Sequence, residues 1–143
     1  MFSTKYLEMI TSIIKEIDET QSENIKQAAE LCAQTINNGK LVHLFGSGHS
    51  VLPVQDMFPR YGGVVGFHPI MDPRLMWMNV IGPGGARELL WLERQEGYIK
   101  NYLQNYNFQE GEVMVVYSHG GLNAAPIEVA LHARSKGLKV VCI

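Results

Sequence analysis

The chain has 143 residues, a mass of 16.0 kDa and 46% apolar residues, enough for one domain with a sizeable core. Twelve basic and fourteen acidic side chains give a formal charge of −2 without any basic strip, which argues against a nucleic-acid partner. No apolar run approaches the ~20 residues that span a bilayer, and no apolar signal core follows Met1. The two cysteines, Cys32 and Cys142, lie far apart in the sequence, and we predict that both are free thiols. We therefore expect a cytoplasmic protein without a membrane partner.

The first forty residues have a helical pattern. Apolar side chains recur every three or four residues on one stripe, namely Tyr6, Ile10, Ile13, Ile14 and Ile17. Thr20 and Glu23 match a capping box, so we predict two helices, at 3–18 and 20–38, closed by Asn38-Gly39. Such a pair packs either on another copy of the chain or on its own sheet, and the pattern leaves both open.

Residues 41–143 alternate between apolar runs and helical patterns. Strands are predicted at 41–45, 63–67, 113–117 and 139–143, helices at 50–60, 86–105 and 125–136, and a loop at 69–85. Runs this apolar are typical of strands buried on both faces of a parallel sheet. We therefore predict an α/β three-layer sandwich within a single domain, 1–143. The last run has no covering helix after it, so we expect either a C-terminally truncated chain or a partner that completes the sheet.

Two loops that follow predicted strands share a composition. Gly46-Ser47-Gly48-His49-Ser50 follows the first strand, and Ser118-His119-Gly120-Gly121-Leu122-Asn123 follows the third. Glycine lets backbone N–H groups approach a ligand, and the positive end of a following helix favours an anion. Ordinary strand-to-helix turns also contain Gly, Ser and Asn. Because both loops carry the same chemistry at the end of the sheet where ligands bind, we predict a phosphate site without lysine.

The spacing of the glycine and serine residues does not match other well-known ligand-binding or catalytic motifs. A dinucleotide fingerprint requires a third glycine where the chain has Val51, and a P-loop requires Gly-Lys-Ser/Thr, which is absent. An esterase elbow requires a glycine where the chain has Leu52. A hydrolase is therefore the weakest of the functional hypotheses.

The pairing of Phe45-Gly46-Ser47-Gly48-His49-Ser50 with Tyr117-Ser118-His119-Gly120-Gly121-Leu122-Asn123-Ala124-Ala125-Pro126-Ile127-Glu128 resembles the sugar isomerase (SIS) domain family of phosphosugar isomerases and phosphosugar-binding proteins. The likeness spans about residues 20–143 and is strongest to a bacterial branch of the family. It implies a flavodoxin-like parallel sheet, a phosphorylated-sugar ligand, and dimers or tetramers with the sugar near the interface.

The resemblance also implies which residues bind the ligand. Side chains at Ser47, Ser50, Ser118 and Asn123 would hold the phosphate, assisted by the backbone at Gly48, His49, His119, Gly120 and Gly121. The family usually has a second serine at the position of Gly120. That departure removes one hydroxyl and leaves the N–H.

Isomerisation of a sugar requires a base beside the carbonyl and an acid for its oxygen. SIS isomerases use a helical glutamate, so the resemblance points to Glu93 or Glu96, which are three residues apart in the predicted helix 86–105. A solvated helix face explains the same pattern. His49 and His119 can orient a sugar, whereas His43 and His132 fit structural roles. No recognisable metal spacing occurs, and no cofactor is expected. A sugar-phosphate isomerase and a non-catalytic phosphosugar sensor both remain open.

Overall fold

The computed structural model describes residues 2–58, 60–76 and 85–143. The chain divides into two compact units after Gln34, six residues before the boundary predicted at residue 40. The first unit consists of most of one helix, α1 (Phe2–Asn37), and the second begins with the last residues of that helix. Each unit is described by itself below.

Helix α1 is continuous, so the prediction of two helices is wrong. The hydroxyl of Thr20 donates to the carbonyl of Glu16 at 2.6 Å, and that of Ser22 donates to the carbonyl of Asp18 at 2.6 Å. Both hydroxyls are therefore satisfied inside the helix, and Thr20 caps nothing. Neither glycine nor proline occurs before Gly39, where φ is +71° and the helix has ended.

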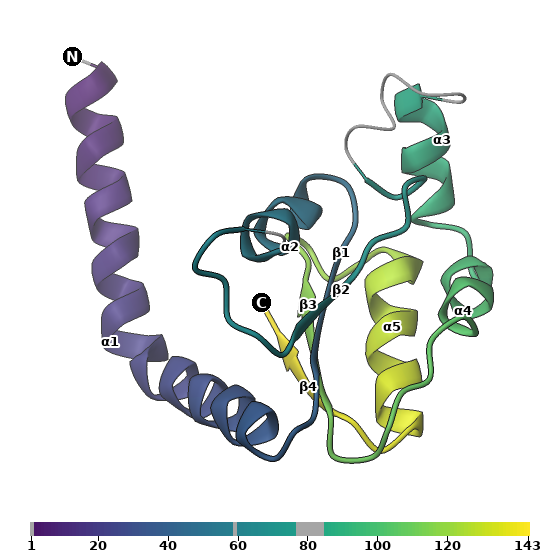
Figure 1. Cartoon of the computed structure of the whole chain (residues 1–143). Helices are drawn as coiled ribbons and strands as arrows, with labels where there is room; N and C mark the ends of the chain where they lie inside the picture. The colour runs from purple at the N-terminus through teal and green to yellow at the C-terminus, as the bar shows by residue number, and fades with distance from the viewer. Residues whose placement is uncertain (1, 59, 77–84) are drawn as a thin grey trace. The chain divides into compact units, whose positions relative to one another are not determined.

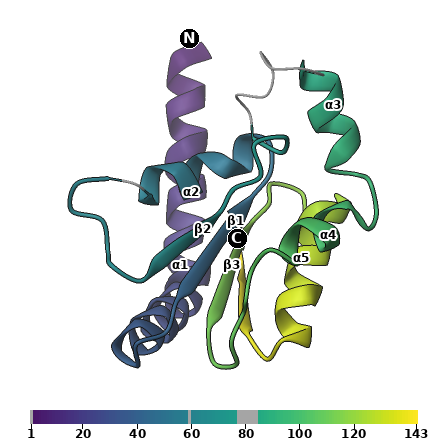
Figure 2. The ribbon, with the colours of Figure 1, turned by 45° about the vertical axis from the view of Figure 1, so that its right-hand side comes forward.

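The second unit is built on a parallel sheet, as predicted (Figures 1 and 2). Its strands are β1 (Val42–Gly46), β2 (Phe67–Ile70), β3 (Val113–Tyr117) and β4 (Lys139–Cys142). They lie in the order β2-β1-β3-β4, and every residue of β1 is buried. The α/β class and the parallel sheet are therefore confirmed.

Strand β2 lies later than the predicted run 63–67. The backbone at Gly62 and Gly66 has φ of +74° and +113°, so the chain turns here and becomes extended only from Phe67. The strand includes Pro69, the first residue of the predicted loop 69–85. An edge strand tolerates proline because one side of it has no partner strand. Of the predicted loop 69–85, residues 77–84 lie outside the described part of the chain.

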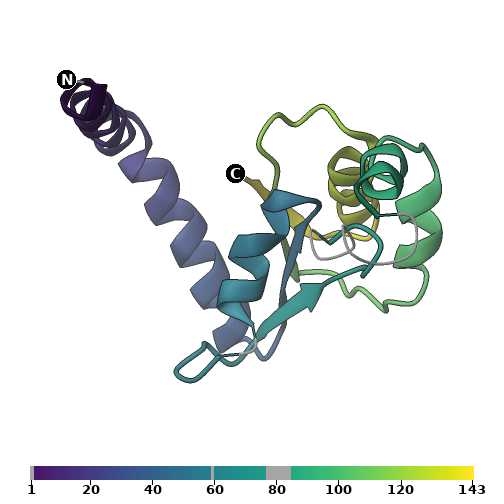
Figure 3. The same ribbon diagram turned by 90° about the horizontal axis from the view of Figure 1, so that it is seen from above.

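Helices cover both faces of the sheet. A 3₁₀ turn, η1 (His49–Val51), leads into α2 (Leu52–Met57) on one face, and α4 (Tyr98–Leu103) and α5 (Ala124–Ser135) lie side by side on the other (Figures 2 and 3). The predicted helix 86–105 is in fact two, α3 (Gly85–Leu92) and α4, because Gly97 adopts φ +80° between them. Among the described residues, no helix is long and apolar enough to cross a bilayer.

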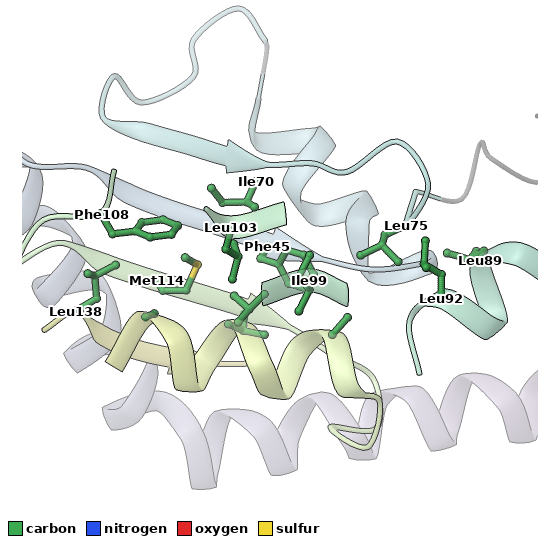
Figure 4. Close-up of a cluster of buried hydrophobic side chains, with 14 residues drawn as sticks. Phe45, Ile70, Leu75, Leu89, Leu92, Ile99, Leu103, Phe108, Met114 and Leu138 are labelled. Carbon is green, nitrogen blue, oxygen red and sulfur yellow. The ribbon is translucent and has the colours of Figure 1, made fainter. Parts of the chain in front are cut away.

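The core lies between the sheet and the α4–α5 layer. Phe45, Ile70 and Met114 project from three neighbouring strands toward Ile99 and Leu103 of α4 (Figure 4). Leu89 and Leu92 of α3 belong to the same cluster and are 1% and 2% exposed. Burial of these two leucines fixes the position of α3, which contributes Leu89 and Leu90 to the candidate site described below.

Candidate functional site

The two glycine-rich loops meet at one edge of the sheet. Strands β1 and β3 are parallel neighbours, and Gly46 pairs with Tyr117 at their carboxyl ends. The loops therefore leave the sheet side by side. With α3 they enclose a pocket of about 860 Å³. It is lined by Ser47, Gly48, His49, Ser50, Pro53, Leu89, Leu90, Glu93, Tyr117, Ser118, His119, Gly120, Gly121, Leu122, Asn123 and Ile143.

The loop after β3 is rich in unused hydrogen-bond donors. Within the described part of the chain, the N–H groups of Gly120 and of residues 122–124 have no protein acceptor. Asn123 precedes α5, a helix of 12 residues, without capping it, so its side-chain amide is also available. Free N–H groups at the positive end of a helix attract an anion. This loop, 118–124, is called the donor loop below.

Two serines, Ser118 in the donor loop and Ser50 beside it, have hydroxyl hydrogens that are not used within the described part of the chain. Ser50 Oγ accepts from the N–H of His119 at 3.4 Å, and Ser118 Oγ accepts from the N–H of Gly121 at 3.0 Å. A hydroxyl that accepts one hydrogen bond keeps its own hydrogen for another acceptor. Both side chains can therefore donate to an anion in the pocket.

The loop after β1 has fewer donors to offer than the sequence suggested. The N–H of Gly48 donates to the carbonyl of Leu75 at 2.7 Å, in a backbone conformation with φ +57°. The N–H of Ser50 donates to the carbonyl of Ser47 at 3.0 Å. The backbone here mainly holds the loop itself together, so the predicted contribution of the Gly48 N–H to a phosphate does not fit the structure.

Gly46 permits the tight turn that brings this loop over the sheet. A Cβ atom at this position would lie 1.9 Å from the backbone oxygen of Ser50. No side chain fits there unless the loop moves. The sequence therefore places glycine where the returning backbone is too close for any other residue.

Glu93 contributes the pocket's carboxylate. It follows α3 directly, is only 7% exposed, and its Oε2 accepts from the hydroxyl of Ser47 at 3.1 Å. The guanidinium of Arg94 is 3.9 Å from Oε1 but is itself largely exposed. The Ser47 hydroxyl is thus bonded to the carboxylate, whereas the resemblance predicts that it holds a phosphate. The sequence identified both residues but gave no sign that they touch.

The charge in the pocket is low. Among its described lining residues there is no lysine or arginine, and Glu93 is the single acidic side chain. His49 and His119, one from each loop, are exposed. The described residues hold no group of three or more His, Cys, Asp or Glu side chains placed to bind a metal ion. Polar recognition in this pocket therefore rests on neutral donors and on one carboxylate side chain.

The structure separates the two glutamates that the helical pattern had put on one face. Glu96 is exposed in the segment 93–97 and does not line the pocket. The pocket gains instead two leucines of α3, Leu89 and Leu90. No motif marked them, because a leucine in a helical pattern indicates burial and not a binding site.

Comparison with known proteins identifies the family to which this chain belongs. Residues 5–143 match the SIS domain. The chain belongs to the SIS domain family. This confirms the family that the two loops indicated, and the donor loop and the loop 46–50 are the SIS motifs that carried the resemblance.

The relatives of this SIS chain are longer than it is. A UPF0309 protein of Caldanaerobacter subterraneus subsp. tengcongensis is 37% identical over 96% of this chain and 54% of its own length. One from Listeria innocua is 34% identical over the same shares. The chain therefore spans about half the length of the curated relatives it matches.

Solved structures support the SIS fold. A phosphoheptose isomerase from Neisseria gonorrhoeae superposes with a TM-score of 0.70 over 99% of this chain and 75% of its own, at 18% identity. One from Francisella tularensis gives 0.67 over 97% of this chain and 71% of its own, at 15% identity. At these identities the likeness establishes the fold.

Proposed function

We propose that the pocket binds a phosphorylated sugar and that Glu93 moves a proton on it, in an aldose–ketose isomerisation. The observation that carries this is that one pocket is lined both by the buried carboxylate of Glu93 and by the neutral anion donors of the donor loop. The phosphate then lies at the donor loop with Ser50 and Ser118, and the reacting carbons lie toward Glu93.

The donor loop suits a phosphate ester. Its unused N–H groups, the hydroxyls of Ser50 and Ser118 and the amide of Asn123 are all donors, and α5 adds the positive end of its dipole. Charge-assisted hydrogen bonds to phosphate oxygens are stronger than neutral ones. The absence of lysine from the described pocket residues is therefore compatible with tight binding.

Glu93 suits the role of base. It would take the proton from the hydroxyl-bearing carbon beside the carbonyl, giving an enediol, and return it to the former carbonyl carbon. The hydroxyl of Ser47 fixes one carboxylate oxygen, and the other remains for the substrate. His49 or His119 would supply the proton to the carbonyl oxygen and then take the proton from the other enediol hydroxyl as the new carbonyl forms, since each lines the pocket. Both assignments are part of the proposal.

The test is proton exchange into a sugar phosphate. The 143-residue chain would be incubated in D₂O with fructose 6-phosphate and sedoheptulose 7-phosphate, and deuterium incorporation beside the carbonyl would be followed by NMR. Thermal shift with the same ligands measures binding, because a ligand that binds the folded state raises its melting temperature. We expect both binding and exchange for at least one sugar phosphate.

Glu93→Gln is the matched variant. It keeps an oxygen that accepts from Ser47 but cannot take a proton. We expect binding within about threefold of the original chain and exchange slower by ~100-fold or more. Binding without exchange in the original chain would favour the second candidate, a phosphosugar sensor. No binding of any sugar phosphate would refute both.

A further inference from the structure

Helix α5 touches the segment that carries Glu93 at two points. The N–H of Ala125 donates to the carbonyl of Glu93 at 3.0 Å, and Oε1 of Glu128 accepts from the N–H of Gly97 at 2.6 Å. Ala125 and Glu128 are three residues apart, so they lie on one face of the helix. The segment 93–97 is therefore held at both of its ends by the same helix.

Glu128 is an unexpected residue for this position. Its second oxygen, Oε2, is buried and has no hydrogen-bond partner among the described residues. A buried carboxylate oxygen without a donor is unfavourable, and natural proteins keep such groups mainly where function requires them. Glu128 does not line the pocket, so direct contact with a ligand does not explain it.

The other backbone hydrogen bonds of the segment that Glu128 holds are mostly to neighbours along the chain, such as those from the N–H groups of Arg94 and Gln95. Between α3 and α4 the chain makes a turn in which Gly97 adopts φ +80°, and Gln95 and Glu96 are exposed. Glu93 is the one buried residue of this segment. Loss of the Gly97 contact would let the turn move and carry the Glu93 backbone with it.

We propose that Glu128 is a positioning residue: by accepting from the Gly97 N–H it fixes the turn 93–97, and so holds the Glu93 carboxylate at a set distance from the donor loop. The donor loop and Glu93 then share one support, because α5 begins at the donor loop and contacts the segment 93–97 through Ala125 and, about one turn later, Glu128. This inference rests on the proposed role of Glu93.

Glu128→Ala and Glu128→Asp both break the contact, since the aspartate is too short to reach Gly97, whereas Glu128→Gln keeps an accepting oxygen. Amide hydrogen exchange by NMR reports on the brace directly. We expect the Ala125 amide to exchange at least tenfold faster in the Ala and Asp variants and normally in the Gln variant. The amide of Met114, in the centre of β3, should be unchanged in all of them.

Catalysis provides the second measurement. For a sugar phosphate that exchanges deuterium, we expect kcat to fall at least tenfold in the Ala and Asp variants with KM within twofold, and Gln to restore it. Glu110→Ala, an exposed glutamate just before β3, is the control and should match the original chain.

The outcomes separate the two proposals. Unchanged Ala125 exchange, equal loss in the Gln and Ala variants, or faster exchange throughout the core would each overturn the positioning role. If the original chain exchanges no deuterium, the proposed isomerase activity fails, and the amide measurements still decide whether Glu128 braces the turn.

Discussion

The rings of His43 and His68 meet across neighbouring strands, with their Nδ1 atoms 2.9 Å apart. On its other side, Nε2 of His43 is 3.0 Å from Oε2 of Glu112. A carboxylate only accepts, so Nε2 of His43 carries a hydrogen; in the neutral ring Nδ1 must then accept, and His68 donates from its own Nδ1. The cluster lies toward the start of β1 and β2, at the end of the sheet opposite the pocket.

We predict that this cluster makes the fold less stable in mild acid. Burial, and then the neighbouring His43, lowers the pKa of His68, against a smaller opposing effect of Glu112. A histidine with a lowered pKa contributes stability above its unfolded pKa, about 6.5, and that contribution is lost as the pH falls. The free energy of unfolding in urea should therefore fall between pH 7 and pH 5.

His132 acts in the same direction, because burial, then Lys136 and Lys100, lower its pKa. A His68→Asn variant should therefore show a shallower decline, whatever its stability at pH 7, and part of the decline should remain. A free energy of unfolding that stays flat or rises from pH 7 to pH 5 would contradict the prediction.

Substitution of Ser50 or Ser118 should weaken the binding of a sugar phosphate more than substitution of Ser47 does. Ser50→Ala and Ser118→Ala each remove a donor to a charged acceptor, at a cost of ~1–3 kcal/mol or about 5- to 150-fold in Kd for a sugar phosphate. Ser47→Ala should leave Kd within about threefold, because its hydroxyl is committed to Glu93. Isothermal titration calorimetry measures all three. Equal losses at Ser47 and Ser118 would mean that the Ser47 hydroxyl also donates to the phosphate.

Alanine substitutions at two glycines of the site should have different effects on stability. Gly46→Ala would place a Cβ against the Ser50 backbone and should lower stability by ~1–3 kcal/mol and weaken sugar-phosphate binding. Gly120→Ala, the control, is predicted to be tolerated, because the nearest atom to its Cβ is a Leu122 carbon at 3.9 Å. Thermal melts and calorimetry on the pair test this.

Gly120→Ser is predicted to gain affinity. The position has room, its φ is not positive, and the SIS family usually has a serine there. One added hydroxyl donor beside the phosphate should tighten Kd by about three- to tenfold. The same change at Gly121, where φ is +61°, should strain the loop and bring no gain. A Gly120→Ser variant that binds no better would place the phosphate away from this residue.

The strands and their loops could be predicted because their signals are local. A buried strand such as 113–117 is continuously apolar, and the glycine and serine residues directly after it mark the loop. The parallel order of the strands then brings the loops together without further information.

The interruptions of helices could not be predicted in this way. Residues 91–96 continue the helical pattern of α3, and only the left-handed backbone of Gly97 shows that the chain turns there. The burial of Glu93, its bond to Ser47 and its brace by Glu128 all depend on that turn. Conversely, Thr20 and Glu23 match the sequence pattern of a capping box, yet the Thr20 hydroxyl bonds to the preceding turn and α1 continues.

Helix α1 presents the apolar stripe that leads to the last prediction. Along its first half the side chains of Tyr6, Ile10, Ile13, Ile14 and Ile17 are 64%, 38%, 45%, 60% and 46% exposed. Burying an isoleucine is worth ~1.5–3 kcal/mol, so several left in water would be a large deficit against the ~5–15 kcal/mol of a typical domain. A second copy can cover the stripe without any new sequence feature. We therefore expect a homodimer or higher oligomer held mainly by α1.

Light scattering at micromolar concentration tests this expectation. The original chain should have a mass of at least twice the 16.0 kDa of a single copy. The double variant Ile10→Lys and Ile14→Lys puts two like charges into the stripe and should shift the mass toward a single copy, since an unpaired charge is costly to bury. Ser12→Lys changes the opposite side of the same helix and should leave the assembly intact. A single species of 16 kDa from the original chain would contradict the prediction, because α1 would then need no second copy.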